Sequence, residues 1–188
     1  MITVCLVRHG ETQENVRQIL QGHIDGILTE SGIAQAQILQ EKLRGQAFDL
    51  FFSSDLKRAY DTALIINKNF NLPIQKTRLL RERDWGELTG VSMQEAQALP
   101  LLPASVETVE QTCMRASFFL KELLKKYDGK RILVVSHGFF LRCMQAVARG
   151  VSFREIPLMQ NAECRFLDID EILPPVLTDK NSTVISAN

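Results

Sequence analysis

Two short apolar runs that each end in histidine and glycine constrain this chain more than any other feature. Residues 4–10 read Val-Cys-Leu-Val-Arg-His-Gly, and residues 132–138 read Ile-Leu-Val-Val-Ser-His-Gly. Apolar runs rich in β-branched residues are typical of buried strands in a parallel sheet. Open α/β sheets bind their ligands at the carboxyl ends of the strands. We therefore predict that His9 and His137 meet at one edge of a single sheet.

Strands and helices alternate along most of the 188 residues. We predict strands at residues 2–7, 48–53, 73–80, 131–136 and 163–169, and helices at residues 30–44, 56–70, 92–99, 107–127 and 138–149. This order is typical of one α/β domain, residues 1–188, in which helices cover both faces of a sheet. The last strand alternates as an edge strand does, and the tail from Pro174 is polar and predicts no element. Residues 10–28 have no sustained period, so we predict a functional loop over the strand ends.

The predicted helix starts carry further information. Thr29 is a predicted N-cap. The apolar stripe of the helix that follows consists of Ile33, Ala36, Leu39 and Leu43. Asp55 is the predicted N-cap of the next helix, whose first turn contains Arg58. An arginine in a first turn opposes the helix dipole. We therefore expect an anion at this helix end, bound by Arg58.

The overall composition excludes several partners. Lysine plus arginine and aspartate plus glutamate number 22 each, so no net field favours nucleic acid or an anionic membrane. No run approaches the roughly 18 apolar residues of a membrane span, and we expect no secretory leader. The four cysteines are scattered without C-x-x-C spacing, which is typical of reduced thiols in the cytoplasm. The oligomeric state cannot be read from these features.

Phosphate is a ligand that the polar residues at the strand ends could bind together. Arg8 and Arg58 carry planar guanidinium groups that match phosphate oxygens in pairs. His9 and His137 add imidazoles, and the backbone N–H of Gly138 opens a helix. One imidazole could attack phosphorus while a carboxylic acid protonates the leaving oxygen. Fixed cations could replace a metal, so we expect neither a metal nor a cofactor.

The chemistry alone leaves the identity of the acid open. Four carboxylates compete for this role: Glu11, Glu82, Asp84 and Glu87. Glu82 lies in a run of charged residues, and such runs are usually solvated faces. Glu11 is expected to be structural and to pair with a nearby cation. His23 is expected to be solvent-exposed, and Trp85 either packs in the core or forms a wall of the pocket.

Residues 6–12, Leu-Val-Arg-His-Gly-Glu-Thr, resemble the signature of the histidine phosphatase superfamily, in its phosphoglycerate-mutase-like branch. Further segments match in order: Asn15, Gln21-Gly22, residues 28–32, residues 53–59, residues 80–86 through Gly90, and residues 136–138. Together these motifs span residues 4 to about 150. The resemblance implies a three-layer α/β/α fold with a mostly parallel central sheet and an antiparallel edge strand.

The resemblance also implies a role for each matching residue. His9 would become phosphorylated, and Arg8, Arg58 and His137 would clamp the phosphoryl group. Asn15 would donate a hydrogen bond to it.

The remaining implied roles concern the substrate and the proton. Gln21 and Gly22 would border the substrate. Glu82 would protonate the leaving oxygen and then act as the base that activates water. Activity in this family generally needs no metal.

The function expected from these features is hydrolysis of a small phosphomonoester through phosphohistidine. A mutase is the main alternative. Residues 90–131 leave little room for the longer insertion that encloses mutase sites, which favours a phosphatase. A non-catalytic phosphate-binding module is less favoured because every motif residue is present. A two-histidine metal site is less favoured because the neighbouring arginines would repel a cation. Phosphosugars, phosphoglycerate, a ribazole phosphate and nucleotides all remain possible substrates.

Overall fold

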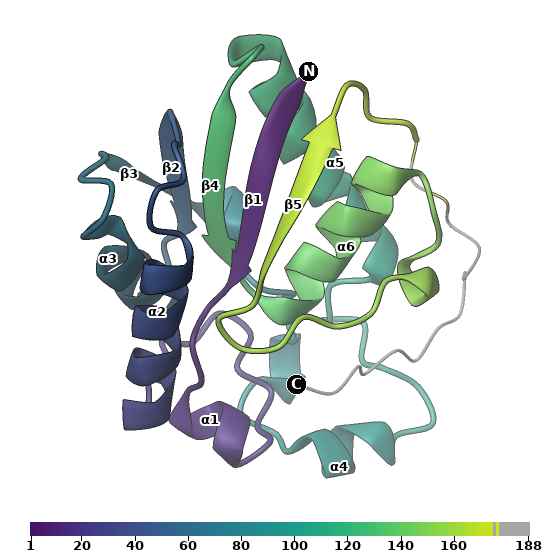
Figure 1. Cartoon of the computed structure of the whole chain (residues 1–188). Helices are drawn as coiled ribbons and strands as arrows, with labels where there is room; N and C mark the ends of the chain where they lie inside the picture. The colour runs from purple at the N-terminus through teal and green to yellow at the C-terminus, as the bar shows by residue number, and fades with distance from the viewer. Residues whose placement is uncertain (175, 177–188) are drawn as a thin grey trace.

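A five-stranded mixed sheet forms the centre of the molecule in the computed structural model, which describes residues 1–174 and 176. The strands are β1 (Ile2–Arg8), β2 (Leu50–Ser54), β3 (Ile74–Thr77), β4 (Arg131–Ser136) and β5 (Cys164–Ile169). Their order across the sheet is β3-β2-β4-β1-β5. Only β5, at one edge, is antiparallel among these described strands (Figure 1). The predicted fold class is therefore confirmed, and most of the tail from Pro174 lies outside the described residues.

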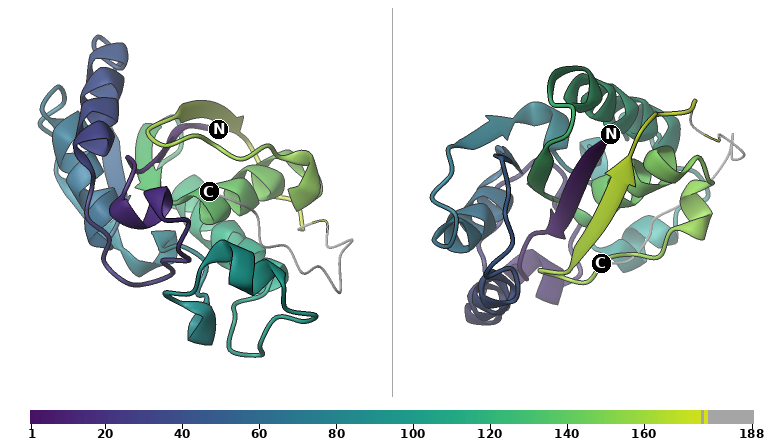
Figure 2. Two further views of the ribbon diagram at one scale, coloured as in Figure 1. Left: turned by 90° about the horizontal axis from the view of Figure 1, so that it is seen from below. Right: turned by 45° about the horizontal axis from the view of Figure 1, so that its top comes forward.

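Helices cover both faces of this sheet (Figures 1 and 2). The described helices are α1 (Gln13–Val16), α2 (Glu30–Lys42), α3 (Lys57–Asn67), α4 (Met93–Gln97), α5 (Val109–Lys126) and α6 (Gly138–Arg149). The described chain also contains short 3₁₀ turns at Arg78–Leu80, Gly86–Leu88 and Phe153–Glu155. Helices α2 and α3 lie on one face, and α5 and α6 lie on the other. No described helix combines the length and the apolar character that a membrane span requires.

The strand sequences explain why the core has two parts. Successive strand side chains point to opposite faces of a sheet. In β1, Val4 and Leu6 join the core under α5 and α6, whereas Cys5 and Val7 join the core under α2 and α3. Both central strands, β1 and β4, are buried on both faces. This is why their sequences are continuously apolar rather than alternating.

Three local predictions differ from the structure. The loop after β1 contains the short helix α1, which is capped by the Thr12 hydroxyl. The predicted third strand ends at Thr77 and continues as a 3₁₀ turn. Ile33 is 40% exposed, because Gly32 faces inward in its place. A Cβ at Gly32 would lie 2.1 Å from the Glu11 carbonyl oxygen. The missing side chain thus lets α2 pack directly against the loop that follows β1.

The topology brings the two histidine motifs together. Strands β1 and β4 are parallel neighbours, and Arg8 is aligned with Ser136. The next N–H along the chain, that of His9, donates to the Ser136 carbonyl at 3.0 Å. His9 and His137 therefore leave adjacent strands at the same level.

Candidate active site

Two buried imidazoles lie side by side at the carboxyl ends of β1 and β4. The ring centroids of His9 and His137 are 5.2 Å apart, and the rings meet edge to face at 61°. His9 Nδ1 lies 2.7 Å from the Gly10 carbonyl oxygen. A carbonyl can only accept, so Nδ1 carries the proton and Nε2 keeps its lone pair. His9 also lines a pocket together with Arg8, Arg58 and Glu82. Its free nitrogen is therefore a candidate nucleophile.

His137 is held by the end of a third strand. Its Nε2 atom lies 2.8 Å from the hydroxyl of Ser54, the last residue of β2. The Ser54 oxygen also accepts a hydrogen bond from the Leu56 N–H at 3.3 Å. The other ring nitrogen of His137, Nδ1, is buried without a partner among the described residues.

Arg8 and Arg58 are buried beside His9, with 2% and 1% of their surfaces exposed. Their guanidinium groups are only partly available to a ligand. Arg8 Nη1 donates to the Met159 carbonyl at 2.6 Å. Arg58 Nη1 and Nη2 donate to the carbonyls of Ile24 and Gly22 at 2.7 and 2.9 Å. The Nε atoms of both arginines lack partners among the described residues. Each arginine therefore holds a wall of the pocket and keeps at least one donor for a ligand.

The amide of Asn15 has a fixed orientation. Its oxygen accepts hydrogen bonds from the Thr12 backbone N–H at 3.0 Å and from Asn161 Nδ2 at 3.3 Å. The Asn15 Nδ2 group is buried and has no partner in the described part of the chain. Because the Thr12 N–H can only donate, this environment sets which amide atom is the oxygen.

Four buried nitrogen atoms in this region lack partners among the described residues, namely Arg8 Nε, Arg58 Nε, Asn15 Nδ2 and His137 Nδ1, as does the oxygen Oε1 of the pocket-lining Gln21. Buried polar groups in native proteins are almost always hydrogen-bonded, and leaving one unpaired costs about 1–3 kcal/mol. Three of the four are obligate donors, and His137 Nδ1 donates when it carries the ring proton. A tetrahedral oxyanion in the pocket would supply acceptors to the donors of its lining residues Arg8, Arg58 and Asn15.

Glu82 lies at the N-terminus of α6. Its carboxylate accepts hydrogen bonds from the backbone N–H groups of Arg83 at 2.8 Å, Phe140 at 3.0 Å and Phe139 at 3.2 Å. The N-terminus of α6 therefore binds the Glu82 carboxylate, and its residues Gly138 and Phe139 also line the pocket. Gly138 lines the pocket against Arg8, and a Cβ there would lie 3.1 Å from Arg8 Nε.

The structure distinguishes the four candidate acids. Only Glu82 lines the pocket that contains His9. Glu11 accepts a hydrogen bond from the Thr29 hydroxyl at 2.8 Å, so it is structural, but a hydroxyl takes the place of the expected cation. Asp84 accepts from the Gly86 N–H at 2.9 Å, and Glu87 accepts from the Ser105 hydroxyl at 3.1 Å.

The remaining pocket lining is mostly apolar. It comprises Leu20, Trp85, Phe139 and Leu158, together with the predicted substrate neighbours Gln21 and Gly22. Trp85 is 4% exposed and belongs to the core as well, so packing and pocket wall are both correct descriptions. Gly22 adopts a φ of +49°, a conformation that L side chains rarely adopt.

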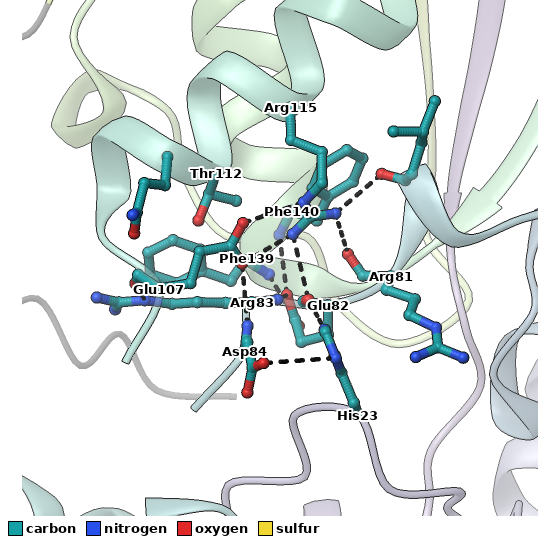
Figure 3. Close-up of polar contacts among 12 residues, drawn as sticks. His23, Arg81, Glu82, Arg83, Asp84, Glu107, Thr112, Arg115, Phe139 and Phe140 are labelled. Carbon is teal, nitrogen blue, oxygen red and sulfur yellow. Dashed lines mark hydrogen bonds and ion pairs between the residues drawn. The ribbon is translucent and has the colours of Figure 1, made fainter. Parts of the chain in front are cut away.

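Two expectations about neighbouring residues were wrong. Asp55 does not cap α3. It pairs instead with Arg81 through two contacts of 2.7 and 2.8 Å, while the Lys57 N–H at the helix start donates to Asp25 at 2.9 Å. His23 is only 33% exposed, and its Nε2 donates to the Glu82 carbonyl at 2.9 Å (Figure 3). Asp55 binds Arg81 instead of the helix start, and His23 binds the Glu82 carbonyl instead of facing solvent. Both partners are distant in sequence.

Sequence reasoning also missed several residues that shape the site. Asn161 donates to the carbonyl of His9 at 3.1 Å as well as to Asn15, and Leu158 and Met159 contribute a wall and an acceptor. All three precede β5 and approach the site only because that strand pairs with β1. No local pattern in the sequence marks them.

Burial and neighbouring charge keep both imidazoles neutral. Desolvation, followed by the positive charge of Arg58, holds the pKa values of His9 and His137 well below 6.5. Burial also lowers the pKa of Arg58 to about 10, which still leaves this arginine charged at neutral pH.

This charge state predicts that the protein loses stability as the pH falls below about 6.5, the ordinary histidine value. The unfolded chain then binds protons that the folded chain excludes, so the free energy of unfolding decreases with decreasing pH. The slope should reach up to about 1.4 kcal/mol per pH unit for each histidine. Urea unfolding between pH 8 and pH 5 measures it. His9→Ala should show a shallower slope, and an unchanged slope would contradict the assignment.

Comparisons with protein families, with curated sequences and with solved structures all identify histidine phosphatases or their relatives. Residues 4–176 match the family described as the histidine phosphatase superfamily (branch 1). The uncharacterized phosphatase PhoE of Bacillus subtilis is 38% identical over 153 residues, covering 80% of this chain and 79% of the relative. A 2,3-bisphosphoglycerate-dependent phosphoglycerate mutase of Methylobacterium radiotolerans is 32% identical over 175 residues, covering 82% of each. The solved mycobacterial glucosyl-3-phosphoglycerate phosphatase aligns with a TM-score of 0.78 at 25% identity, covering 87% of this chain and 88% of that one.

Proposed function

The chain belongs to branch 1 of the histidine phosphatase superfamily, and we propose that it hydrolyses small phosphomonoesters through a phosphorylated His9. The observation that carries this proposal is the set of buried, unpartnered nitrogen atoms around His9. Arg8, Arg58 and Asn15, together with His137, would bind the phosphoryl oxygens. These groups supply positive charge where the transition state develops negative charge.

The proposed reaction has two steps. In the first, His9 Nε2 attacks phosphorus, the bond to the leaving oxygen breaks, and the Glu82 carboxylic acid gives its proton to that oxygen. In the second, the Glu82 carboxylate takes a proton from water as the water oxygen attacks phosphohistidine. The bond between phosphorus and His9 Nε2 breaks, phosphate leaves, and both His9 and the Glu82 acid are restored.

The pocket lining supports hydrolysis over mutase chemistry. Among the described residues, Arg8 and Arg58 are the cations that line the pocket, and both flank the proposed phosphoryl site. Phosphoglycerate mutases must also hold the carboxylate of their substrate. The walls Leu20, Trp85 and Phe139 suit the uncharged part of a small ester instead. The four cysteines are free thiols, so we place the reaction in the reducing cytoplasm.

Product analysis tests this function. With 3-phosphoglycerate and an excess of chelator, we expect release of inorganic phosphate to exceed formation of 2-phosphoglycerate by at least about tenfold. Efficient isomerisation with little phosphate release would establish a mutase. Loss of turnover on chelation would support the metal alternative, and failure to form any acid-labile phosphoenzyme would support a binding module. A panel of phosphosugars, nucleotides and ribazole phosphate then identifies the preferred substrate.

A further inference from the structure

One side chain of α5, Arg115, binds three backbone carbonyls in the segment that carries Glu82. Arg115 Nη1 donates to the carbonyls of Leu79 and Arg81 at 2.9 and 2.7 Å, and its Nη2 donates to the Glu82 carbonyl at 3.3 Å (Figure 3). One planar group thus fixes three carbonyls within four consecutive residues. Arg115 does not line the pocket that contains His9.

Glu107 orients this guanidinium group. Its carboxylate accepts from Arg115 Nε at 3.0 Å and from Nη2 at 2.9 Å, and the two side chains are only 15% and 19% exposed. Glu107 also accepts from the Asp84 N–H at 3.0 Å, and its own N–H donates to the Asp84 carbonyl at 2.8 Å. The ion pair therefore holds the acid-bearing segment on both sides of Glu82.

A second path links Arg115 to the carboxylate itself. The guanidinium carbon lies 4.4 Å from the centre of the Phe140 ring. The Phe140 N–H in turn donates to Glu82 Oε1 at 3.0 Å. Arg115 thus contacts both the backbone that carries the acid and the residue that binds its oxygen.

We propose that Arg115, oriented by Glu107, is a positioning residue that sets the location of the Glu82 carboxyl group relative to the leaving oxygen. This inference rests on the proposed function. A displacement of about 1 Å in a reacting group can cost about 10²-fold in rate. The loss should appear only in steps that use Glu82.

The test compares two substrates with each variant. Glycerol phosphate has a poor leaving group and needs the acid, whereas p-nitrophenyl phosphate does not. For Arg115→Met we expect kcat/KM to fall by about 30- to 100-fold with glycerol phosphate and by less than about threefold with p-nitrophenyl phosphate. Arg115→Lys and Glu107→Gln should fall in between. The ratio of the two kcat/KM values is independent of the fraction of folded enzyme, so partial unfolding does not mask the result.

Arg142→Met is the matched control. Arg142 also stacks on a phenylalanine, with its guanidinium carbon 4.2 Å from the centre of the Phe153 ring. It likewise donates to backbone carbonyls, those of Ile156 and Arg154, but away from Glu82. Its substitution should leave the ratio between the two substrates unchanged.

A double variant decides whether Arg115 acts through Glu82. In a Glu82→Gln background, Arg115→Met should have almost no further effect on glycerol phosphate turnover. An equal loss with both substrates, or full additivity with Glu82→Gln, would overturn the proposal. Absence of turnover by the unsubstituted protein would instead count against the proposed function, so the two failures are distinguishable.

Discussion

Replacing His9 with alanine should abolish turnover, with a loss on the order of 10⁴-fold or more, while the fold survives. His137 and His23 are not placed to take over the attack, because neither lines the pocket that contains His9 and Nε2 of His137 is hydrogen-bonded to Ser54. The ring of His9 lies beyond the end of β1 and contributes one side-chain hydrogen bond, to its neighbour Gly10. Its removal should therefore lower stability only by about 1–3 kcal/mol.

Trapping of the intermediate checks this expectation. After incubation with a radiolabelled phosphodonor and rapid denaturation, the natural protein should carry an acid-labile phosphate, and His9→Ala should carry none. His23→Ala provides the control, because the chain has three histidines and this one lies outside the pocket lining. It should still become labelled. If His9→Ala became labelled, another residue would be the nucleophile. Thermal unfolding measurements check that both variants are folded.

The second large effect concerns Glu82→Gln. This substitution keeps the size of the side chain but removes the transferable proton, so kcat/KM for alkyl phosphates should fall by about 10²–10⁴-fold. Esters of p-nitrophenol should be much less affected, because their leaving group needs no proton. The ratio kcat/KM reports only the steps up to formation of phosphohistidine, whereas kcat also includes hydrolysis of phosphohistidine.

A measurable change in stability should accompany this loss of activity. The carboxylate accepts hydrogen bonds from the N–H groups of Arg83, Phe139 and Phe140. An amide has only one oxygen, so at least one of these donors would face an NH₂ group. The free energy of unfolding should fall by about 1–2 kcal/mol. If Glu82→Gln slows alkyl and aryl esters alike, Glu82 is not the proton donor.

The sequence predicted the parts of this site that depend on strand ends. His9 and His137 follow apolar runs, and the rule that ligands bind at the carboxyl ends of strands is sufficient to bring them together. The rest depends on contacts between distant residues. Asp55 looked like a helix cap because nothing in the sequence places Arg81 beside it. Arg115 belongs to an ordinary amphipathic helix, and its contact with Glu82 spans 33 positions.

Motif register pointed to Glu82, which lines the pocket that contains His9, although its charged neighbours suggested a solvated surface. The structure explains this mismatch. Arg83 is 1% exposed, with its guanidinium carbon 4.5 Å from the centre of a Trp85 ring and 4.6 Å from that of Phe139. Aromatic faces thus bury a cation that a charge pattern would assign to solvent.

The strand order has a consequence for biosynthesis. Strand β4 lies between β1 and β2, yet it is made more than 120 residues after β1. A nascent chain that stops before residue 131 has the first histidine but lacks the strand that joins the two halves of the sheet. Phosphate affinity should therefore arise only late in translation, after β4 and the site residues that precede β5 have been made. Truncated products would be inert toward cellular phosphoesters.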